Sequence, residues 1–309
     1  MTLTELRYIV AVAKERHFGR AAAACFVSQP TLSVAVKKLE DELDLVLFER
    51  GKTEVRITPA GERVVAQAKR VLEEVEAIKR VARQDQDQLD GPLRLGAIYT
   101  VAPYLLPQLL PVLHKQAPKM PLVIEENYTA RLRERLQQGE LDAIIISLPF
   151  AEPGIKVRAL YDEPFMVVLP ASHPWRERGA IAVKELAEEP VLMLGTGHCF
   201  REQVLSVCPE CRHVPVADDP LAKAMEGGSL ETIRLMVASG LGMTVMPCTA
   251  TGADKYAQRL LVLKRFKAPV PKRRVALAWR EGFYRPRAIA ALAKAIHDCR
   301  LSCVEFVGR

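Results

Sequence analysis

Residues 20–50 read RAAAACFVSQPTLSVAVKKLEDELDLVLFER, and this stretch decides how the N-terminal part of the chain folds. Its alanine-rich start predicts a short helix whose small side chains permit close approach of another helix. Ser28 is a good N-cap and Pro30 is tolerated in a first turn, so a further helix is expected to begin there. Apolar residues at helical spacing mark one face of that helix: Leu32, Val36, Leu39 and Leu43.

An amphipathic helix precedes this stretch, because apolar residues recur at helical spacing from Leu3 to Ala13. Three helices with a tight turn, within about the first 45 residues, predict a helix-turn-helix. The short apolar runs 45–48 and 55–57 flank Glu49-Arg50-Gly51-Lys52, a pattern that is typical of a small β-hairpin or wing. Residues 1–58 are therefore predicted to form a winged DNA-binding domain.

Thr58-Pro59 predicts the start of a long helix, with Thr58 as its N-cap. An apolar stripe continues along it for about six turns. The stripe consists of Val64, Val65, Ala68, Val71, Leu72, Val75, Ile78 and Ala82. We interpret residues 59–90 as a dimerisation linker; the alternative is that the stripe packs on its own domain. Asp90-Gly91-Pro92 then indicates a domain boundary.

Beyond the boundary, strand-like and helical stretches alternate. The order βαβαβ is expected over 93–98, 103–116, 122–126, 130–138 and 143–147, which predicts a parallel α/β sheet. Further strands are expected at 165–169, 191–194, 243–246 and 275–279, and further helices at 230–238 and 286–298. Residues 91–309 are long enough for two α/β lobes with a ligand cleft between them.

Composition limits the function classes. The 309 residues are 49% hydrophobic and 26% charged, which is typical of a globular protein. The net charge is +7, but residues 1–90 carry 15 basic and 15 acidic side chains, so a prediction of DNA binding rests on motif geometry. No secretory signal and no apolar span for a membrane are recognisable, and a cytoplasmic protein without a membrane partner is expected.

Seven cysteines are many for a chain in a reducing compartment. Four of them, Cys25, Cys248, Cys299 and Cys303, are expected to be inert core or surface thiols. The other three, Cys199, Cys208 and Cys211, cluster. With a histidine they could hold zinc, but the spacing is poor and we expect no metal. Cys208 and Cys211 could instead form a C-x-x-C redox pair. A third interpretation is a reactive thiol at Cys199 with a resolving partner at Cys208.

The third interpretation fits best. His198 and Arg201 are positive groups beside Cys199 that could favour its thiolate, the nucleophile that attacks a peroxide O–O bond. Residues 199–207 are expected to be at least partly helical, and nine helical residues span roughly 13 Å, whereas a disulfide needs Cα atoms less than about 7 Å apart. Joining Cys199 to Cys208 would thus require the segment to unwind, which would make the bond a conformational switch.

The helix that begins near Ser28 has side chains suited to a major groove. Short hydroxyls and an amide at its start can meet base edges, and basic side chains nearby can contact phosphates. Capping of the helix and a solvated surface are the alternatives for these residues. The predicted DNA-binding set is Arg20, Ser28, Gln29, Pro30, Thr31, Ser33, Lys37, Lys38 and Arg50, with Lys52 as a further candidate in the wing.

As a set, several N-terminal motifs resemble the winged helix-turn-helix of LysR-type transcriptional regulators. They are Ala21 to Ala24, Ser28 to Ser33, Lys38-Leu39-Glu40, Leu47 to Arg50 and Thr58 to Gly61. The resemblance implies a homodimer, often a homotetramer, whose effector domain has two lobes like those of periplasmic binding proteins. The fold expected for the whole chain is therefore a winged helix-turn-helix, a linker helix and a two-lobed α/β domain.

The rest of the chain resembles the peroxide-sensing branch of that family. The matching stretches are Thr100 to Pro107, Asp162 to Pro164, His173 to Trp175, His198-Cys199 with Arg201 and Cys208, and Ser229 to Thr232. The resemblance implies that Cys199 is the peroxidatic residue and Cys208 the resolving one. It also implies that Thr100, Thr129 and His198 bind and polarise peroxide, although both threonines could also cap helices. It further implies a nearby arginine, for which we choose Arg273 over Arg274.

We therefore expect a regulator of peroxide-defence genes, activating or repressing, that binds double-stranded promoter DNA and hydrogen peroxide. RNA polymerase is a further candidate partner, and no cofactor is expected. Two alternatives remain open. One is a regulator of the same family that senses a small metabolite, with incidental cysteines. The other is a thiol peroxidase, against which the helix-turn-helix argues, so an enzyme is not expected.

Overall fold

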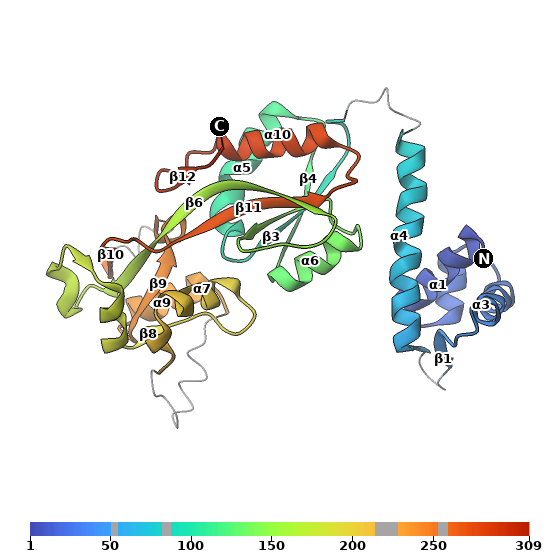
Figure 1. Ribbon diagram of the computed structural model, residues 1–309, viewed down its shortest axis with the longest axis horizontal. Helices are drawn as coiled ribbons and strands as arrows, with labels where there is room; N and C mark the ends of the chain where they lie inside the picture. Colours follow the sequence, from blue (N-terminus) through green and yellow to red (C-terminus); the bar gives the residue numbers. More distant parts are fainter. Residues whose placement is uncertain (51–54, 82–87, 214–227, 253–258, 309) are drawn as a thin grey trace. The chain divides into compact units, whose positions relative to one another are not determined.

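The structure is a computed structural model that describes residues 1–50, 55–81, 88–213, 228–252 and 259–308. The chain divides into two compact units, Met1–Gln86 and Asp87–Arg309 (Figure 1). The long helix that we expected to be a separate linker belongs to the first unit. Among the described residues, no helix is both long and apolar enough to cross a membrane.

The first unit has the predicted winged helix-turn-helix. Its helices are α1 (Leu3–Glu15), α2 (Phe18–Ala24) and α3 (Gln29–Leu43), and its wing is the antiparallel pair β1 (Phe48–Arg50) and β2 (Val55–Ile57). Thr2 and Glu5 form a capping box at the start of α1, and the His17 side chain caps α2. The apolar faces of the helices meet in one core around Ile9, Leu32 and Leu39.

Helix α4 (Pro59–Val81) completes this unit, and its apolar stripe is used in two ways. In the first half, Val65 and Ala68 are buried against the core that includes α1, as the alternative interpretation held. Further along, Val71 is 36% exposed and Ile78 is 68% exposed. The second half of the stripe is therefore covered only in part by its own unit, because Leu72 packs against this core whereas Val71 and Ile78 remain exposed. Ala82 lies outside the described residues.

The second unit is built on a mixed sheet, whose main path among the described strands runs β4-β3-β5-β11-β6-β10-β7. Its strands are β3 (Leu93–Ile98), β4 (Leu122–Asn127), β5 (Ala143–Ser147), β6 (Ile155–Pro170), β7 (Ala180–Ile181), β8 (Val191–Leu192), β9 (Met243–Pro247), β10 (Leu261–Phe266), β11 (Lys272–Arg280) and β12 (Glu305–Phe306). The parallel arrangement predicted for the βαβαβ stretch is confirmed, but the later strands make the whole sheet mixed. Strand β3 is parallel to β4 and β5, but β11 is antiparallel to both of its neighbours because it returns from the far lobe.

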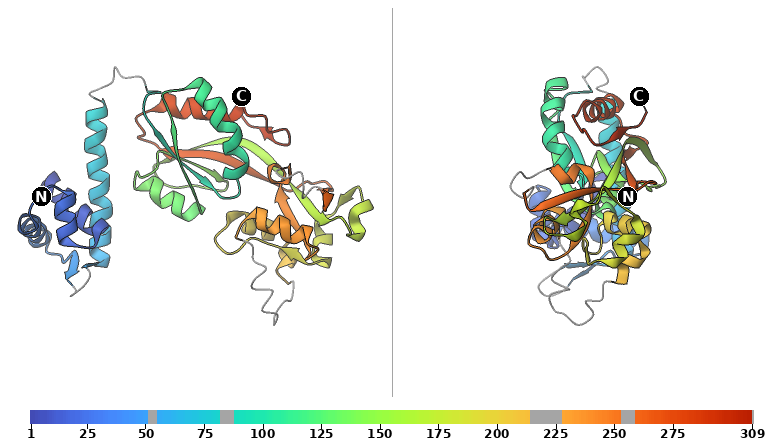
Figure 2. Two further views of the ribbon diagram at one scale, coloured as in Figure 1. Left: turned by 180° about the vertical axis from the view of Figure 1, so that it is seen from behind. Right: turned by 90° about the vertical axis from the view of Figure 1, so that its left-hand side faces the viewer.

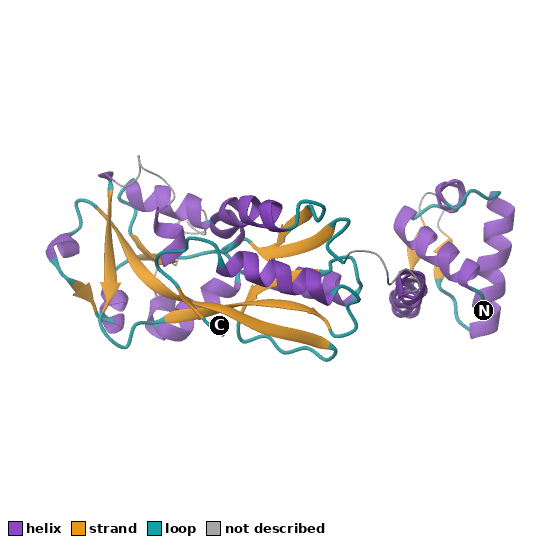
Figure 3. Cartoon of the chain, turned by 90° about the horizontal axis from the view of Figure 1, so that it is seen from above, coloured by secondary structure: helices purple, strands orange, loops and turns teal. Residues whose placement is uncertain are grey.

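Two hydrophobic cores confirm the two lobes. The first contains β3 to β5 with α5 (Ala102–Gln116), α6 (Thr129–Gln137) and α10 (Pro286–His297), and α5 and α10 pack side by side (Figure 2). The second contains β8 and β9 with α7 (Cys199–Val207) and α9 (Leu230–Ala238). Strand β6 contributes residues to both cores, so one long strand connects the lobes (Figure 3).

Candidate functional site

Four of the predicted site residues line one small cavity where the two lobes meet. Thr100 follows β3, Thr129 opens α6, and His198 and Cys199 begin α7. Strands β3 and β4 are parallel, so their carboxyl ends place the two threonines at one edge of the sheet. The cavity has a volume of about 10 Å³, close to the smallest space that holds a water molecule. It is therefore sized for a very small polar molecule.

Neither threonine caps a helix, which removes the alternative interpretation of both. The N-caps are Val101 for α5 and Tyr128 for α6, and neither forms a side-chain cap. The Thr129 hydroxyl oxygen is buried and has no hydrogen-bond partner among the described residues. The Thr100 hydroxyl oxygen accepts a hydrogen bond from Arg273. A hydroxyl that accepts one bond can still donate its own proton, so both groups can serve a ligand in the cavity.

Arg273 supports the cavity from behind. Its Nη1 and Nη2 donate to the Thr100 hydroxyl and carbonyl over 2.7 and 2.8 Å, and its Nε donates to Glu163 over 2.7 Å. Both side chains of this ion pair are fully buried. Glu163 in turn accepts hydrogen bonds from the backbone N–H and the hydroxyl of Thr249. A continuous polar network thus runs from Thr100 through the second lobe.

Arg274 has a different role. It forms a partly exposed, two-bond ion pair with Asp162, while Arg273 faces the interior. The reason is strand geometry, since Arg273 lies opposite Glu163 and Arg274 opposite Asp162 in the β11–β6 pairing, and successive residues of a strand point to opposite faces. Glu163 and Thr249 were not predicted as site residues, because their place depends on the pairing of β6 with β11 and with β9.

His198 is buried against the edges of two aromatic rings. Its ring centroid lies 4.8 Å from that of Tyr128 and 5.9 Å from that of Tyr99. Burial lowers the pKa of His198, and a backbone hydrogen bond with Gly228 opposes that shift only in part. The lowered pKa favours the neutral imidazole, so the structure gives no support to a positive charge on His198 beside Cys199. A neutral imidazole remains able to donate or accept a proton.

Arg201, the other expected positive neighbour, is not among the residues that line this cavity. One of its guanidinium N–H groups donates to the carbonyl of Leu194 over 2.8 Å, and Arg201 lines a separate small cavity. A positive potential can reach Cys199 from the helix itself, because Cys199 is the first residue of α7. The amino end of a helix carries a partial positive charge, which favours negative charge on a group placed there.

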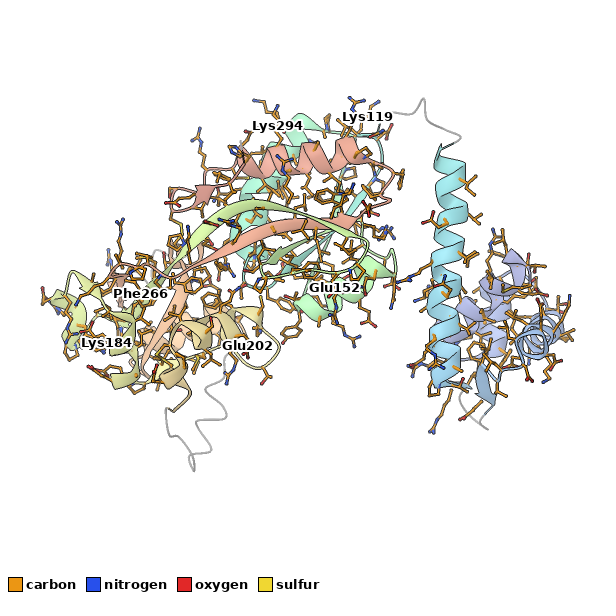
Figure 4. All side chains as sticks on the ribbon, in the orientation of Figure 1. Lys119, Glu152, Lys184, Glu202, Phe266 and Lys294 are labelled. Atoms are coloured by element: carbon orange, nitrogen blue, oxygen red, sulfur yellow. A yellow bond between two sulfur atoms is a disulfide. The ribbon has the colours of Figure 1, made fainter. Side chains whose placement is uncertain are left out.

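Helix α7 connects the two cores. At its start Cys199 packs against the core of the first lobe, and at its end Cys208 is completely buried in the core of the second. Gln203 ties the helix to the first lobe by donating to the Ser147 hydroxyl over 2.7 Å. Glu202, labelled in Figure 4, is exposed. The predicted helix over residues 199–207 is confirmed, and it keeps Cys199 and Cys208 apart.

In this structure Cys208 is joined to Cys211 and not to Cys199. The pair forms a disulfide with Cα atoms 5.5 Å apart, and Cys199 is a free thiol. Both paired cysteines lie in the second core. No group of three metal-ligating side chains gathers in the described part of the chain, so the zinc interpretation has no geometric support. The C-x-x-C interpretation does have such support.

The expectation of four inert thiols is wrong for two of them. Cys248, at the end of β9, and Cys303, near the C-terminus, are joined by a disulfide with Cα atoms 6.1 Å apart. They are separated by 55 residues and meet because β9 and β12 both pair with β6. Cys25 and Cys299 are free, as expected.

The start of α3 presents most of the predicted base-reading residues to solvent. Gln29, Pro30 and Thr31 are exposed, and Ser33 is half-buried. Ser28 is the N-cap and accepts from the Thr31 backbone N–H over 3.3 Å. Two residues that the sequence analysis did not select are also exposed here: Phe26 at 95% and Val34 at 69%. Apolar side chains of this kind can contact thymine methyl groups.

The predicted phosphate-binding residues lie on the same unit. Arg20, Lys37 and Lys38 are exposed, and each forms an ion pair: Arg20 with Glu15, Lys37 with Asp41, and Lys38 with the buried Glu5. Exposed pairs of this type contribute little to stability and can exchange partners. Arg50 ends strand β1, and Lys52 lies outside the described residues.

Comparison with known proteins gives consistent results over the whole chain. Residues 3–62 match the family model for bacterial regulatory helix-turn-helix proteins of the LysR family, and residues 86–299 match the LysR substrate-binding domain. The chain is 40% identical to the DNA-binding transcriptional dual regulator OxyR of Escherichia coli K12 over 296 residues, which cover 96% of this chain and 95% of that protein.

Solved structures agree with these relatives. Full-length OxyR from Pseudomonas aeruginosa, in a cysteine mutant, matches with 54% identity and a TM-score of 0.82, covering 97% of this chain and 96% of that one. A cysteine mutant of Corynebacterium glutamicum OxyR with hydrogen peroxide bound matches with 32% identity and a TM-score of 0.63, covering 96% of this chain and 91% of that one. The chain belongs to the LysR family of transcriptional regulators.

Proposed function

We propose that this protein is a hydrogen-peroxide sensor that regulates transcription by binding promoter DNA. The observation that carries the proposal is the cavity beside Cys199, which has room for about one water-sized molecule and is lined by Thr100, Thr129 and His198. Pockets for larger organic ligands usually have volumes of about 300–1,000 Å³, so the cavity beside Cys199 is too small for a ligand of that size. A relative from Pectobacterium carotovorum, 40% identical over 91% of this chain and 91% of that protein, is named as a hydrogen peroxide-inducible genes activator, which supports the same function.

The first chemical step is attack of the Cys199 thiolate on one peroxide oxygen. The O–O bond breaks, the sulfur becomes a sulfenic acid, and the other oxygen leaves as hydroxide or, after proton transfer, as water. The unpartnered Thr129 hydroxyl and the Thr100 hydroxyl held by Arg273 orient the peroxide by hydrogen bonds. His198 lines the same cavity, and its neutral imidazole can take the proton of the Cys199 thiol as the thiolate forms and then donate that proton to the leaving oxygen.

The second step is attack of the Cys208 thiol on the sulfenic acid, which forms the Cys199–Cys208 disulfide and releases water. Intact α7 holds the two Cα atoms about 13 Å apart, so the helix must unwind before the bond can form. Unwinding exposes the buried side chains of Phe200, Val204 and Leu205, at a cost of roughly 5–9 kcal/mol in total. The covalent bond therefore selects a conformation that is rare in the reduced protein.

The altered second lobe then changes how the regulatory units assemble, and with them how paired DNA-binding units contact a promoter. The exposed apolar side chains of Val71 and Ile78 on α4 support a homodimer, and two such dimers could form a homotetramer. The exposed start of α3 supports base readout. RNA polymerase is the expected partner when binding activates a gene.

Replacement of Cys199 by serine tests this function. The Cys199→Ser protein should bind operator DNA with unchanged affinity and show the same footprint before and after peroxide. The matched control is Cys25→Ser, which removes another free, partly exposed thiol and should leave the response intact. A footprint that still shifts in the Cys199→Ser protein would remove Cys199 from the mechanism.

The alternatives give different results in the same assays. If the protein senses a small metabolite, titration of its thiols with peroxide should show no selective oxidation of Cys199. If the protein is a thiol peroxidase, it should consume peroxide continuously in the presence of a reductant. Deletion of residues 1–88 should then leave the rate of consumption unchanged.

A further inference from the structure

We propose that Cys211 is a third redox residue, which takes over the disulfide from Cys199 and so returns the sensor to its helical state. This inference rests on the proposed function, because it concerns the bond that peroxide creates. It assigns to Cys211 a direct part in the chemistry, as the thiol that attacks Cys208.

The structure has the geometry expected of the product of such an exchange. Helix α7 is intact from Cys199 to Val207, Cys199 is free, and Cys208 is paired with Cys211. The Cα atoms of this pair are 5.5 Å apart, inside the usual range for a disulfide. Both residues lie in the second core beside Val204. This bond therefore fits the folded helix, whereas a Cys199–Cys208 bond requires the helix to unwind.

Cys211 also stays within reach of Cys208 when the helix unwinds, since only two residues separate them in the chain. The exchange is written as attack of the Cys211 thiolate on the Cys208 sulfur of the Cys199–Cys208 bond. A new Cys208–Cys211 bond forms, the old bond breaks, and Cys199 leaves as a thiolate. Disulfides exchange by this route without any external oxidant or reductant. The proton lost by Cys211 is balanced by the proton that Cys199 regains.

The direction of the exchange follows from folding. The number of disulfides does not change, but release of Cys199 allows α7 to form again. Phe200, Val204 and Leu205 then return to buried positions, which favours the product through the hydrophobic effect. Cys199 also returns to the first-lobe core, beside the two threonines. The protein thus keeps the oxidation as a Cys208–Cys211 bond while the signalling conformation is lost.

Two observable consequences distinguish this scheme from a two-cysteine switch. The conformational response to one dose of peroxide should decay without any reductant, because the exchange is internal. The regenerated Cys199 thiol should then react with a second molecule of peroxide, although its usual resolving partner is already occupied.

The experiment is a time course of disulfide mapping on the full-length, fully reduced protein. One equivalent of hydrogen peroxide is added without reductant, samples are alkylated at intervals, and disulfide-linked peptides are identified by mass spectrometry. The Cys199–Cys208 linkage should appear first and then decline as Cys208–Cys211 rises, while Cys199 becomes alkylated again. The wild-type protein is sufficient for this test, so it does not depend on a variant that folds.

Cys211→Ser is the matched variant. Its Cys199–Cys208 linkage should persist. Peroxide consumption is measured per subunit after subtraction of the consumption by Cys199→Ser. It should be about one equivalent for Cys211→Ser and about two equivalents for the wild type. The relay is wrong if the Cys199–Cys208 linkage of the wild type persists with Cys211 alkylated throughout. It is also wrong if Cys208–Cys211 forms equally fast in Cys199→Ser. A protein in which Cys199 is never oxidised would instead contradict the proposed function itself.

Discussion

Two threonines illustrate how single residues prepare the cavity. The Thr100 hydroxyl is oriented by Arg273, and Arg273 is held in turn by Glu163. The Thr129 hydroxyl is buried without a partner among the described residues, an arrangement that normally costs free energy. A group left unsatisfied in the free protein can be satisfied by a ligand. The cavity is therefore prepared for a small molecule that accepts or donates hydrogen bonds.

Substitution of Thr129 by valine should separate function from stability. Because its hydroxyl is buried without a partner among the described residues, the variant should have a free energy of unfolding at least equal to that of the wild type. Loss of one hydrogen bond to peroxide, worth about 1.4 kcal/mol at most, should slow oxidation of Cys199 by up to about tenfold. Stopped-flow trapping of the sulfenic acid measures that rate, and Thr129→Ser should restore it. An unchanged rate in Thr129→Val would exclude this hydroxyl from peroxide binding.

His198 predicts a pH dependence of stability. Burial places its folded-state pKa below the ordinary value of 6.5, so the unfolded chain binds a proton more readily than the folded chain. Stability should therefore be complete above about pH 6.5 and should fall as the pH drops from there towards the folded-state pKa. Urea unfolding between pH 5 and 8 measures this, and His198→Asn should show a smaller fall over the same interval. An equal fall in both proteins would contradict this contribution.

At the scale of elements, α7 is a short helix whose ends belong to different cores. Cys199 packs on the first core and Cys208 lies in the second. A nine-residue helix has little stability of its own, so tertiary packing keeps it folded. Small changes in helix propensity should therefore change how easily the Cys199–Cys208 bond forms, without altering either sulfur.

Ser206, an exposed residue of α7, allows that test. Ser206→Ala should stabilise the helix and Ser206→Gly should destabilise it, with about 1 kcal/mol between the two variants. The rate of Cys199–Cys208 formation after sulfenic acid trapping should be about fivefold higher in the glycine variant. Quenched-flow alkylation with mass spectrometry gives the rates. Identical rates in the two variants would mean that the helix does not have to unwind.

Elements were predictable where the decisive signals are local. Ser28 before Pro30 marked the start of α3, and the spacing of Leu32, Val36 and Leu39 marked its buried face. The Arg273–Glu163 pair and the Cys248–Cys303 bond were not predictable in this way. They depend on which strands lie beside β6, and the partners are 110 and 55 residues apart in the chain. Cys199 and His198 were singled out from the cysteine cluster itself, whereas Thr100 and Thr129 were found only through the family resemblance, because they reach the cavity through the order of the strands in the sheet.

At the level of the whole molecule, the proposed function divides the work between the two units: one senses peroxide and the other binds DNA. The two units have separate cores, and α4 belongs to the DNA-binding unit. Ile78 is an exposed residue of the apolar stripe on α4. An exposed apolar stripe on a helix of this length is typical of a surface that pairs with a second copy.

Ile78→Glu should therefore weaken the dimer while leaving both units folded. We expect at least a tenfold rise in the dimer dissociation constant, because a charge would be buried in an apolar seam. Sedimentation measures the dissociation constant, and operator affinity should fall in parallel. Glu74→Ala, at an exposed position of the same helix, is the control. An unchanged dimer would assign the exposed stripe to another partner.

Amide hydrogen exchange across residues 199–207 shows whether the Cys199–Cys208 bond unwinds α7. It is best measured in the Cys211→Ser protein, where no exchange can remove the Cys199–Cys208 bond. In the reduced form these amides should be protected, and after one equivalent of peroxide they should exchange at rates close to those of an unfolded segment. If α7 stays fully protected while the same sample contains the Cys199–Cys208 bond, the bond forms without unwinding of the helix and is not the conformational switch.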